Sequence, residues 1–217
     1  QGCLKMKEFK SLLNEDVSQR EYCAWCREIP LAVGQKTGYG AVVVYRIGEG
    51  KNGWFATLSP KTGGSEKDFT IQLMTQAHLT HFAQIDSYPE LAKNYGTAFA
   101  RIAKAMTSIM AEEQRDFKAA SAIREESASV ATYGKSTTWK EKKEHLHIKL
   151  FPFRGNVGQP YTVDSTFGKK VIHKDEEGEY VKMKPVKKVM IDEKRFEVLA
   201  KQLISLFKKD KAFITNR

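Results

Sequence analysis

His145-Leu146-His147-Ile148-Lys149-Leu150-Phe151 is the stretch that most constrains the fold of this 217-residue chain. Polar and apolar residues alternate along it, and a period of two residues is typical of a β-strand. Successive side chains of a strand point to opposite faces of the sheet. The predicted core face consists of Leu146, Ile148 and Leu150, and the opposite face consists of His145, His147, Lys149 and Phe151.

The polar face of this predicted strand suits chemistry on phosphate. A neutral imidazole is a nucleophile near pH 7, and a lysine ammonium is a compact positive charge that attracts phosphate oxygens. The stretch therefore favours phosphoryl or nucleotidyl transfer. A solvent-exposed polar face with two surface histidines is the alternative interpretation of the same pattern.

Three further strands are predicted upstream of this stretch. β-Branched residues at 41–46 and an extended pattern at 54–58 predict a hairpin, because the residues between them are rich in glycine. A loop at 59–68 then leads to a third predicted strand at 69–74.

A long amphipathic helix is predicted after these strands. From Leu91 to Ile109 the apolar residues fall three or four apart, with Ser87 as the expected cap and Pro89 near the first turn. The apolar stripe of this helix is expected to face the core. Residues 111–136 are polar and helix-prone, and we expect them to extend the helix or to form an insertion.

The two ends of the chain are predicted to add further elements. The spacing from Met6 to Leu13 predicts a short N-terminal helix. A hairpin is expected from 170–172 and 179–183, with its turn at 175–178, and a closing helix is expected from Asp192 onward.

Composition favours a folded chain that binds anions. Hydrophobic residues make up 41% and charged residues 29%, and the formal charge of +10 attracts anionic partners, including nucleotides and nucleic acid. The lysines at 140–143, 182–188 and 208–211 are expected on solvated faces. No run approaches the roughly eighteen apolar residues of a membrane span, and the first ten residues do not resemble a signal peptide. We therefore expect a cytoplasmic protein without a membrane partner.

The chain has three cysteines, of which Cys23 and Cys26 are separated by two residues. An odd number of cysteines in a reducing compartment argues against a disulfide framework. A C-x-x-C pair suits metal binding or redox chemistry, and the pair alone does not distinguish them.

The order of these motifs resembles the histidine-triad superfamily. Its signature is His-φ-His-φ-His-φ-φ, or His-x-His-x-Gln in the galactose-1-phosphate uridylyltransferase branch, and here Lys149 stands at the third position, followed by Pro152 and Arg154. The motifs that precede it in the same order are Cys23-Ala24-Trp25-Cys26, Glu28-Ile29-Pro30, Gln76-Ala77-His78-Leu79 and Tyr88-Pro89-Glu90-Leu91. The resemblance covers about residues 22–154.

This resemblance implies roles for individual residues. His147 matches the nucleophile that attacks an α-phosphate, and Lys149 and Arg154 are expected to neutralise phosphate oxygens. The resemblance also implies a structural zinc ion, because family members with this order of ligands hold zinc with two cysteines and two histidines. The expected ligands are Cys23, Cys26, His78 and His145. His81 is the alternative to His78, and a buried thiol pair without metal is the alternative to the whole site.

The sequence as a whole predicts a single α+β domain over 1–217. The histidine-triad-like core spans about 22–154, as an antiparallel sheet with a long packed helix, and the C-terminal hairpin and helix extension spans 155–217. The expected function is a hydrolase or nucleotidyltransferase that acts on a nucleotide or nucleotide conjugate through a nucleotidyl-histidine intermediate. The alternative is a catalytically weak module that binds nucleotides or nucleic acid. A homodimer is compatible with the resemblance.

Overall fold

The computed structural model describes residues 17–63, 68–113, 130–134, 145–152, 170–175, 178–183 and 188–212. Of these, it describes the backbone alone at 19, 63, 130–134, 170–175, 178–183, 188 and 209–212. The predicted helix at Met6–Leu13 and the predicted phosphate ligand Arg154 lie outside the described residues. So do most of the lysine side chains that were expected on solvated faces.

The described strands are β1 (Val42–Ile47), β2 (Trp54–Leu58), β3 (Lys61–Gly63), β4 (Ile71–Thr75), β5 (Val130–Gly134), β6 (His147–Pro152), β7 (Lys170–Asp175), β8 (Gly178–Met183) and β9 (Lys188–Met190). The described α-helices are α2 (Pro89–Glu113) and α4 (Glu193–Ala212). The described 3-10 helices are η1 (Val17–Gln19), η2 (Cys26–Glu28), η3 (Gly50–Asn52) and η4 (Phe82–Ser87). The fold is therefore α+β, as predicted.

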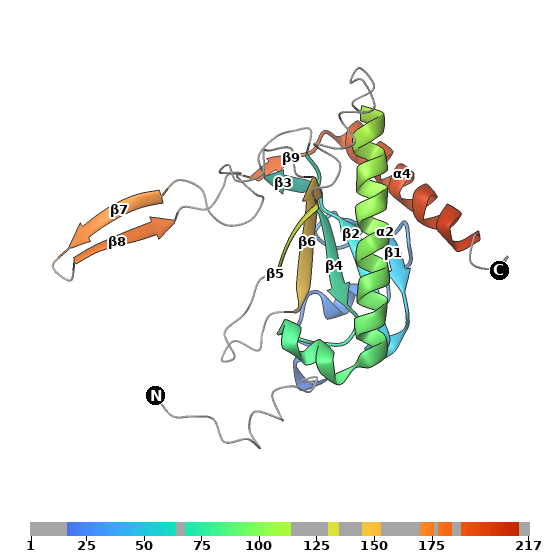
Figure 1. Ribbon diagram of the computed structural model, residues 1–217, viewed down its shortest axis with the longest axis horizontal. Helices are drawn as coiled ribbons and strands as arrows, with labels where there is room; N and C mark the ends of the chain where they lie inside the picture. The colour runs from blue at the N-terminus through green and yellow to red at the C-terminus, as the bar shows by residue number, and fades with distance from the viewer. Residues whose placement is uncertain are drawn as a thin grey trace.

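The main sheet has five strands in the order β1-β2-β4-β6-β5, and every neighbouring pair is antiparallel (Figure 1). The polar stretch that opened the sequence analysis forms β6, which lies between β4 and β5. Two further sheets of two strands pair β3 with β9 and β7 with β8. The backbone of β6 is hydrogen-bonded to β4 on one side and to β5 on the other. This pairing fixes which side chains of β6 point to each face of the sheet.

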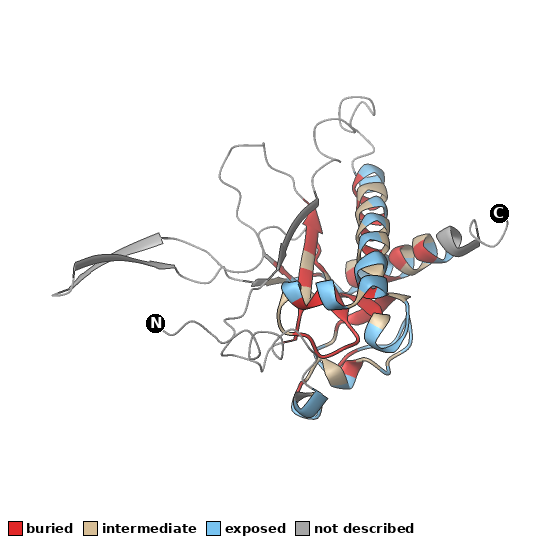
Figure 2. Cartoon of the chain, turned by 60° about the horizontal axis from the view of Figure 1, so that its bottom comes forward, coloured by how far each residue is buried: buried red, intermediate tan, exposed pale blue. Residues whose placement is uncertain are grey.

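One core lies between one face of the main sheet and the helices α2 and α4. The strands β2, β4 and β6 contribute alternate apolar residues to this core, whereas β1 contributes the adjacent Val44 and Tyr45 at an irregularity in its register. Leu146, Ile148 and Leu150 are buried in the core as predicted. The apolar stripe of α2, including Ile102 and Met106, packs against them, and Figure 2 shows that the burial along α2 is one-sided. The indole nitrogen of Trp54 donates to the carbonyl of Leu91 at 2.8 Å and so ties the start of α2 to β2.

Helix α4 belongs to the same core. The carboxylate of Asp192 accepts the backbone N–H of Arg195 at 3.1 Å, which is the hydrogen bond of an N-cap and begins the helix where the sequence predicted. Leu203 is fully buried, and Phe207 packs on Tyr45 with ring centroids 4.7 Å apart. The predicted C-terminal addition therefore stabilises β1 directly.

The second face of the sheet is also covered. Phe55 and Met74 are fully buried there, in register with each other across β2 and β4. The guanidinium of Arg46 lies over the ring of Phe55 at 5.7 Å and donates to the carbonyls of Ile29 and Leu31. These bonds hold the segment that follows η2 against the sheet.

Four details differ from the sequence-based prediction. Residues 130–134 form β5 rather than helix, because Val130, Thr132 and Tyr133 favour a strand once β6 offers its edge. Ser87 ends η4 and does not cap α2, whose first residue is Pro89. The expected loop at 59–68 contains β3, which pairs with β9 far along the chain, and the β9 strand was also not predicted.

Among the described residues, no helix is long and apolar enough to cross a membrane.

The placement of α4 in the core can be tested by shortening a buried side chain. Leu203→Ala should lower the free energy of unfolding by about 2–5 kcal/mol, because it leaves a cavity between α4 and the sheet. Urea denaturation followed by circular dichroism measures this change. The control is Val198→Ala, whose side chain in the same helix is 53% exposed and whose loss should cost less than about 0.5 kcal/mol. Equal effects of the two substitutions would contradict the packing of α4 described above.

Candidate metal centre and the neighbouring histidine

Two cysteines and two histidines converge from three separate parts of the chain. Cys23 precedes η2 and Cys26 begins it, and the backbone N–H of Arg27 donates to the carbonyl of Cys23 at 3.4 Å, so that the chain turns between them. His78 follows β4, and His145 precedes the first residue of β6. Because β4 and β6 are hydrogen-bonded neighbours, the end of one strand lies beside the start of the other.

The spacing of the four side chains suits a four-coordinate metal ion. The Sγ atom of Cys26 lies 3.3 Å from Nδ1 of His78 and 3.4 Å from Nδ1 of His145, and the Sγ atom of Cys23 lies 3.6 Å from Nδ1 of His145. All four ligand atoms lie within 4.8 Å of one another. Metal bonds of 2.0–2.3 Å at tetrahedral angles separate the ligand atoms by about 3.5 Å. The cluster can therefore hold a metal ion after small adjustments.

The imidazole of His145 is oriented for metal binding by Thr75. Its Nε2 lies 2.6 Å from the carbonyl oxygen of Thr75, and because a carbonyl only accepts, Nε2 carries the proton and donates. The unprotonated Nδ1 therefore faces the two sulfur atoms. A backbone carbonyl that fixes the tautomer of a histidine is a frequent outer partner of metal ligands.

The two thiols share their protons unequally. A hydrogen bond from Cys26 is the main cause that lowers the pKa of Cys23 to about 2, and hydrogen bonds from both histidines act in the same direction against burial. The same hydrogen bond, followed by burial and the negative charge of Cys23, raises the pKa of Cys26 above its ordinary range. One thiolate thus forms readily, and a bound cation would replace the remaining proton.

His81, the alternative ligand, lies outside this cluster. It is the N-cap of η4, where its Nδ1 accepts the backbone N–H of Ala83 at 3.1 Å, while Gln84 completes a capping box. The helical spacing that would have brought His81 to the site of His78 does not occur, because the chain between them is not helical.

His147 lies beside the metal cluster on the second face of the sheet. Its Nδ1 lies 3.0 Å from the carbonyl oxygen of His145, so Nδ1 carries the proton and the lone pair of the neutral ring resides on Nε2. Its ring stacks on the indole of Trp25 with centroids 5.7 Å apart and an interplanar angle of 25°. Trp25 also contacts Tyr39, whose ring centroid is 6.1 Å away.

Lys149 follows His147 on the same face of β6. Both side chains are half-buried, whereas Ile148 between them is buried in the core. Lys149 is in register with Gln72 of β4 and with Tyr133 of β5. The structure thus brings together five of the predicted site residues, with Lys149 nearby: Cys23, Cys26, His78, His145 and His147. Of the predicted site residues, Arg154 lies outside the described part of the chain.

Sequence reasoning missed three residues of this region. Trp25 lies between the two cysteines, and its contact with His147 depends on the fold of the metal cluster. Thr57, on the same face of β2 as Phe55, is fully buried, and its hydroxyl has no hydrogen-bond partner within the described residues. Glu28 is 5% exposed, and burial raises the pKa of its carboxyl while a hydrogen bond with Thr37 opposes that shift. Buried polar atoms without protein partners are candidates for contacts to a ligand.

Comparisons with known proteins give no match. No protein-family model, no curated protein and no solved structure matches the chain.

The metal cluster can be tested by removing one sulfur. Cys26→Ser should lose the bound metal and lower the melting temperature by about 5 °C or more. The reason is that the three remaining ligand side chains would no longer be joined by a shared metal ion. Elemental analysis of the purified protein measures the metal, and differential scanning calorimetry measures the melting temperature. His81→Asn keeps an N-cap residue on η4 and serves as the control, with metal content unchanged. A wild-type protein that folds without any metal would refute the assignment.

Proposed function

We propose that the protein binds a nucleotide or nucleotide conjugate and transfers or hydrolyses its α-phosphoryl group with His147 as the nucleophile. The observation that carries this proposal is the contact between Nδ1 of His147 and the carbonyl oxygen of His145 at 3.0 Å. Donation from Nδ1 to the carbonyl of His145 leaves the lone pair on Nε2 and holds the ring in one orientation. A nucleophilic imidazole held in this way needs no rotation before it attacks.

The proposed reaction has two steps. In the first, Nε2 of His147 bonds to the α-phosphorus, and the bond from phosphorus to the leaving group breaks. The leaving atom, an oxygen in a polyphosphate or a nitrogen in a phosphoramidate, departs with the electron pair and takes a proton from solvent. In the second, water or an acceptor hydroxyl attacks phosphorus, the bond between nitrogen and phosphorus breaks, and a proton is released. Imidazole is a good leaving group in the second step because its nitrogen recovers a stable lone pair.

Lys149 supplies the positive charge for this reaction. Its place two residues after His147 on one strand face keeps the ammonium near any phosphate that His147 attacks. A fixed cation stabilises the negative charge that develops on the phosphate oxygens. Arg154, two residues after the end of β6 at Pro152, is proposed as a second cation on the basis of the resemblance alone, and Thr57 is a candidate hydroxyl contact for the ligand.

We further propose that the metal ion is zinc and that its role is structural. Two thiolates and two imidazoles form the donor set that zinc prefers in closed sites. When bound, the ion would supply folding energy and would leave no open position for substrate. This arrangement, together with the order of motifs, supports a histidine-triad-type fold related to the galactose-1-phosphate uridylyltransferase branch.

A binding module without efficient turnover is the second candidate. The observation that favours it is Lys149, a permanent cation at a position where the family signature has histidine or glutamine. A lysine ammonium holds a phosphate tightly by charge but does not reproduce the neutral hydrogen bonds of those residues. Saturable nucleotide binding without detectable turnover would support this candidate.

The nucleophile can be identified by trapping the intermediate. Wild-type protein incubated with adenosine phosphoramidate or a dinucleoside polyphosphate should yield a nucleotidyl adduct on His147, located by mass spectrometry after a basic quench. His147→Ala should lower the rate about a thousandfold or more, because the covalent route is lost. Its metal content should stay unchanged, and His81→Asn should retain full rate. An adduct on another residue would refute the proposed mechanism.

Lys149→Gln separates charge from shape at the third signature position. We expect the affinity for nucleotide to fall about tenfold, because a charge-assisted contact to phosphate is lost while the side-chain length is nearly kept. Isothermal titration calorimetry at two salt concentrations measures the affinity, and the salt dependence should weaken in the variant. Unchanged affinity and rate would place Lys149 outside the working site.

A further inference from the structure

A series of ring contacts extends from His147 through Trp25 to Tyr39. The imidazole of His147 stacks on the indole of Trp25 with centroids 5.7 Å apart and an interplanar angle of 25°. The same indole contacts the phenol ring of Tyr39, with centroids 6.1 Å apart and an interplanar angle of 36°. Because both contacts share Trp25, the ring of Tyr39 lies one side chain away from the proposed nucleophile.

Tyr39 is the exposed end of this series of rings. It is 66% exposed, and within the described residues its ring contacts one other ring, that of Trp25. Much of the phenol ring is therefore open to solvent. A Cβ atom at Gly38, the preceding residue, would meet no atom within 4 Å beyond its chain neighbours, so open space adjoins the turn. A ligand has room beside the ring of Tyr39.

The turn that carries Tyr39 is held by Thr37, whose side chain is buried. Its hydroxyl oxygen accepts the backbone N–H groups of Tyr39 at 3.3 Å and of Ala41 at 3.1 Å, and its side chain also bonds to the carboxyl of Glu28 in η2. The backbone N–H of Gly40 donates to the carbonyl of Thr37 at 3.0 Å and closes the turn. An exposed tyrosine on a fixed backbone loses little conformational freedom when it binds a flat ligand.

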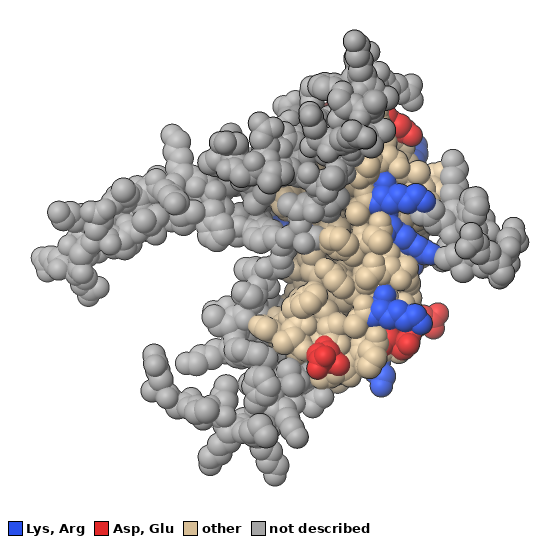
Figure 3. Space-filling model, viewed as in Figure 1, with Lys and Arg blue, Asp and Glu red and all other residues tan. Residues whose placement is uncertain are grey.

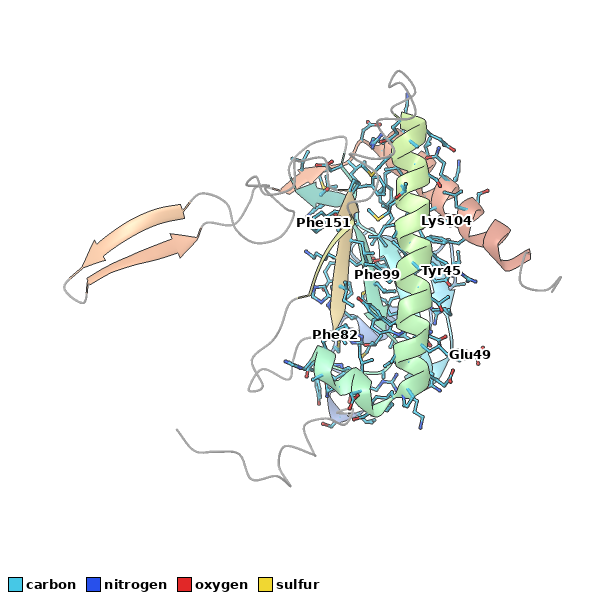
Figure 4. The ribbon with its side chains drawn as sticks, viewed as in Figure 1. Tyr45, Glu49, Phe82, Phe99, Lys104 and Phe151 are labelled. Carbon is cyan, nitrogen blue, oxygen red and sulfur yellow. The ribbon has the colours of Figure 1, made fainter. Side chains whose placement is uncertain are left out.

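The basic side chains along α2 lie on the other side of the sheet. Figure 3 shows Lys and Arg side chains along the side of the molecule on which α2 lies, and Lys104, labelled in Figure 4, is an exposed residue of that helix. Helix α2 packs on the core face of the sheet, whereas His147 lies on the opposite face. The sheet therefore separates these charges from the ring that Trp25 stacks on, and they offer a control for diffuse attraction of anions.

We propose that the base of a nucleotide stacks on Tyr39 while its phosphate lies at His147. The inference rests on the function proposed above and narrows the ligand to a phosphate that carries a flat aromatic ring. The order of the groups supports it, because a sugar separates phosphate from base in a nucleotide, and Trp25 separates His147 from Tyr39 here. Stacking on an aromatic side chain accepts every base, since each base has a π-face. Purine and pyrimidine nucleotides should therefore both bind, and sugar phosphates without a base should bind weakly.

The test compares two ligands that carry the same phosphate. Adenosine 5′-monophosphate has a base, and methyl β-ribofuranoside 5-phosphate has a methoxy group in its place. Isothermal titration calorimetry of the full chain should give a dissociation constant about tenfold lower for the nucleotide. Tyr39→Leu should raise the constant for the nucleotide about tenfold and that for the riboside less than about twofold, because only the base contact is lost. Tyr39→Phe keeps the ring and should stay within about twofold for both.

Two control variants separate this contact from general effects. Tyr22 is 77% exposed in the same N-terminal segment and makes no ring contact within the described residues, so Tyr22→Leu should leave both constants within about twofold. Lys104→Gln removes a charge from the α2 side and should also change them less than about twofold. All of these variants retain the four metal ligands, so their metal content should equal that of the wild type.

Equal weakening of both ligands by Tyr39→Leu would overturn the inference, because Tyr39 would then act on the phosphate contact or on the fold. Equal affinity of the wild type for both ligands, or no binding of the nucleotide, would also overturn it, and this comparison requires no variant. The two proposals fail in different ways. A preference for the nucleotide that depends on Tyr39, without an adduct on His147, would refute the reaction and keep the base contact. An adduct on His147 with an affinity independent of Tyr39 would do the opposite.

Discussion

The convergence of two sulfurs and two imidazoles is the constraint on which the rest of the site depends. Cys23 and Cys26 come from the segment that precedes the sheet, whereas His78 and His145 come from the ends of two paired strands. Among the described residues, these contacts join the N-terminal segment to the middle of the sheet at the point where β6 begins. Within residues 17–40, the described bonds to the sheet region are otherwise those of Arg46 to the carbonyls of Ile29 and Leu31, of Arg20 to the carbonyl of Gln76, and of the backbone at 34–37 to the backbone at 41–43.

The two faces of the main sheet have different roles. One face forms a continuous apolar core with α2 and α4, which fixes the strands and their register. The other carries Thr57, His147 and Lys149 among buried apolar neighbours, with Trp25 over His147. Polar groups in such surroundings interact more strongly with a ligand than they would in water, because little solvent competes for them. The stability supplied by the first face allows the second to hold polar side chains that contribute little to folding.

Local patterns in the sequence predicted the elements that local physics determines. The alternation in β6, the hairpin of β1 and β2, the apolar stripe of α2 and the cap at Asp192 all follow from neighbouring residues, and the structure confirms them. Predictions failed where a distant partner decides the outcome, as in β5, which needs the edge of β6, and in β3, which needs β9. For the same reason the stacking of Trp25 on His147 could not be predicted, although the convergence of Cys23, Cys26, His78 and His145 was. The histidine-triad assignment and the role of His147 stay predictions, because the fold and the cluster alone do not test them.

The spacing of one residue between His145 and His147 links the metal cluster to the proposed nucleophile. Strand alternation places both side chains on one side of the chain, yet His145 turns to the cysteines and its carbonyl accepts the Nδ1 proton of His147. Trp25 lies between Cys23 and Cys26 in the sequence, and its ring stacks on the ring of His147. The contacts of His147 with the carbonyl of His145 and with the ring of Trp25 therefore involve a residue of the cluster and a residue between its two cysteines. A metal ion at this cluster would therefore hold the residues that contact the imidazole of His147, and would act on that ring through geometry alone.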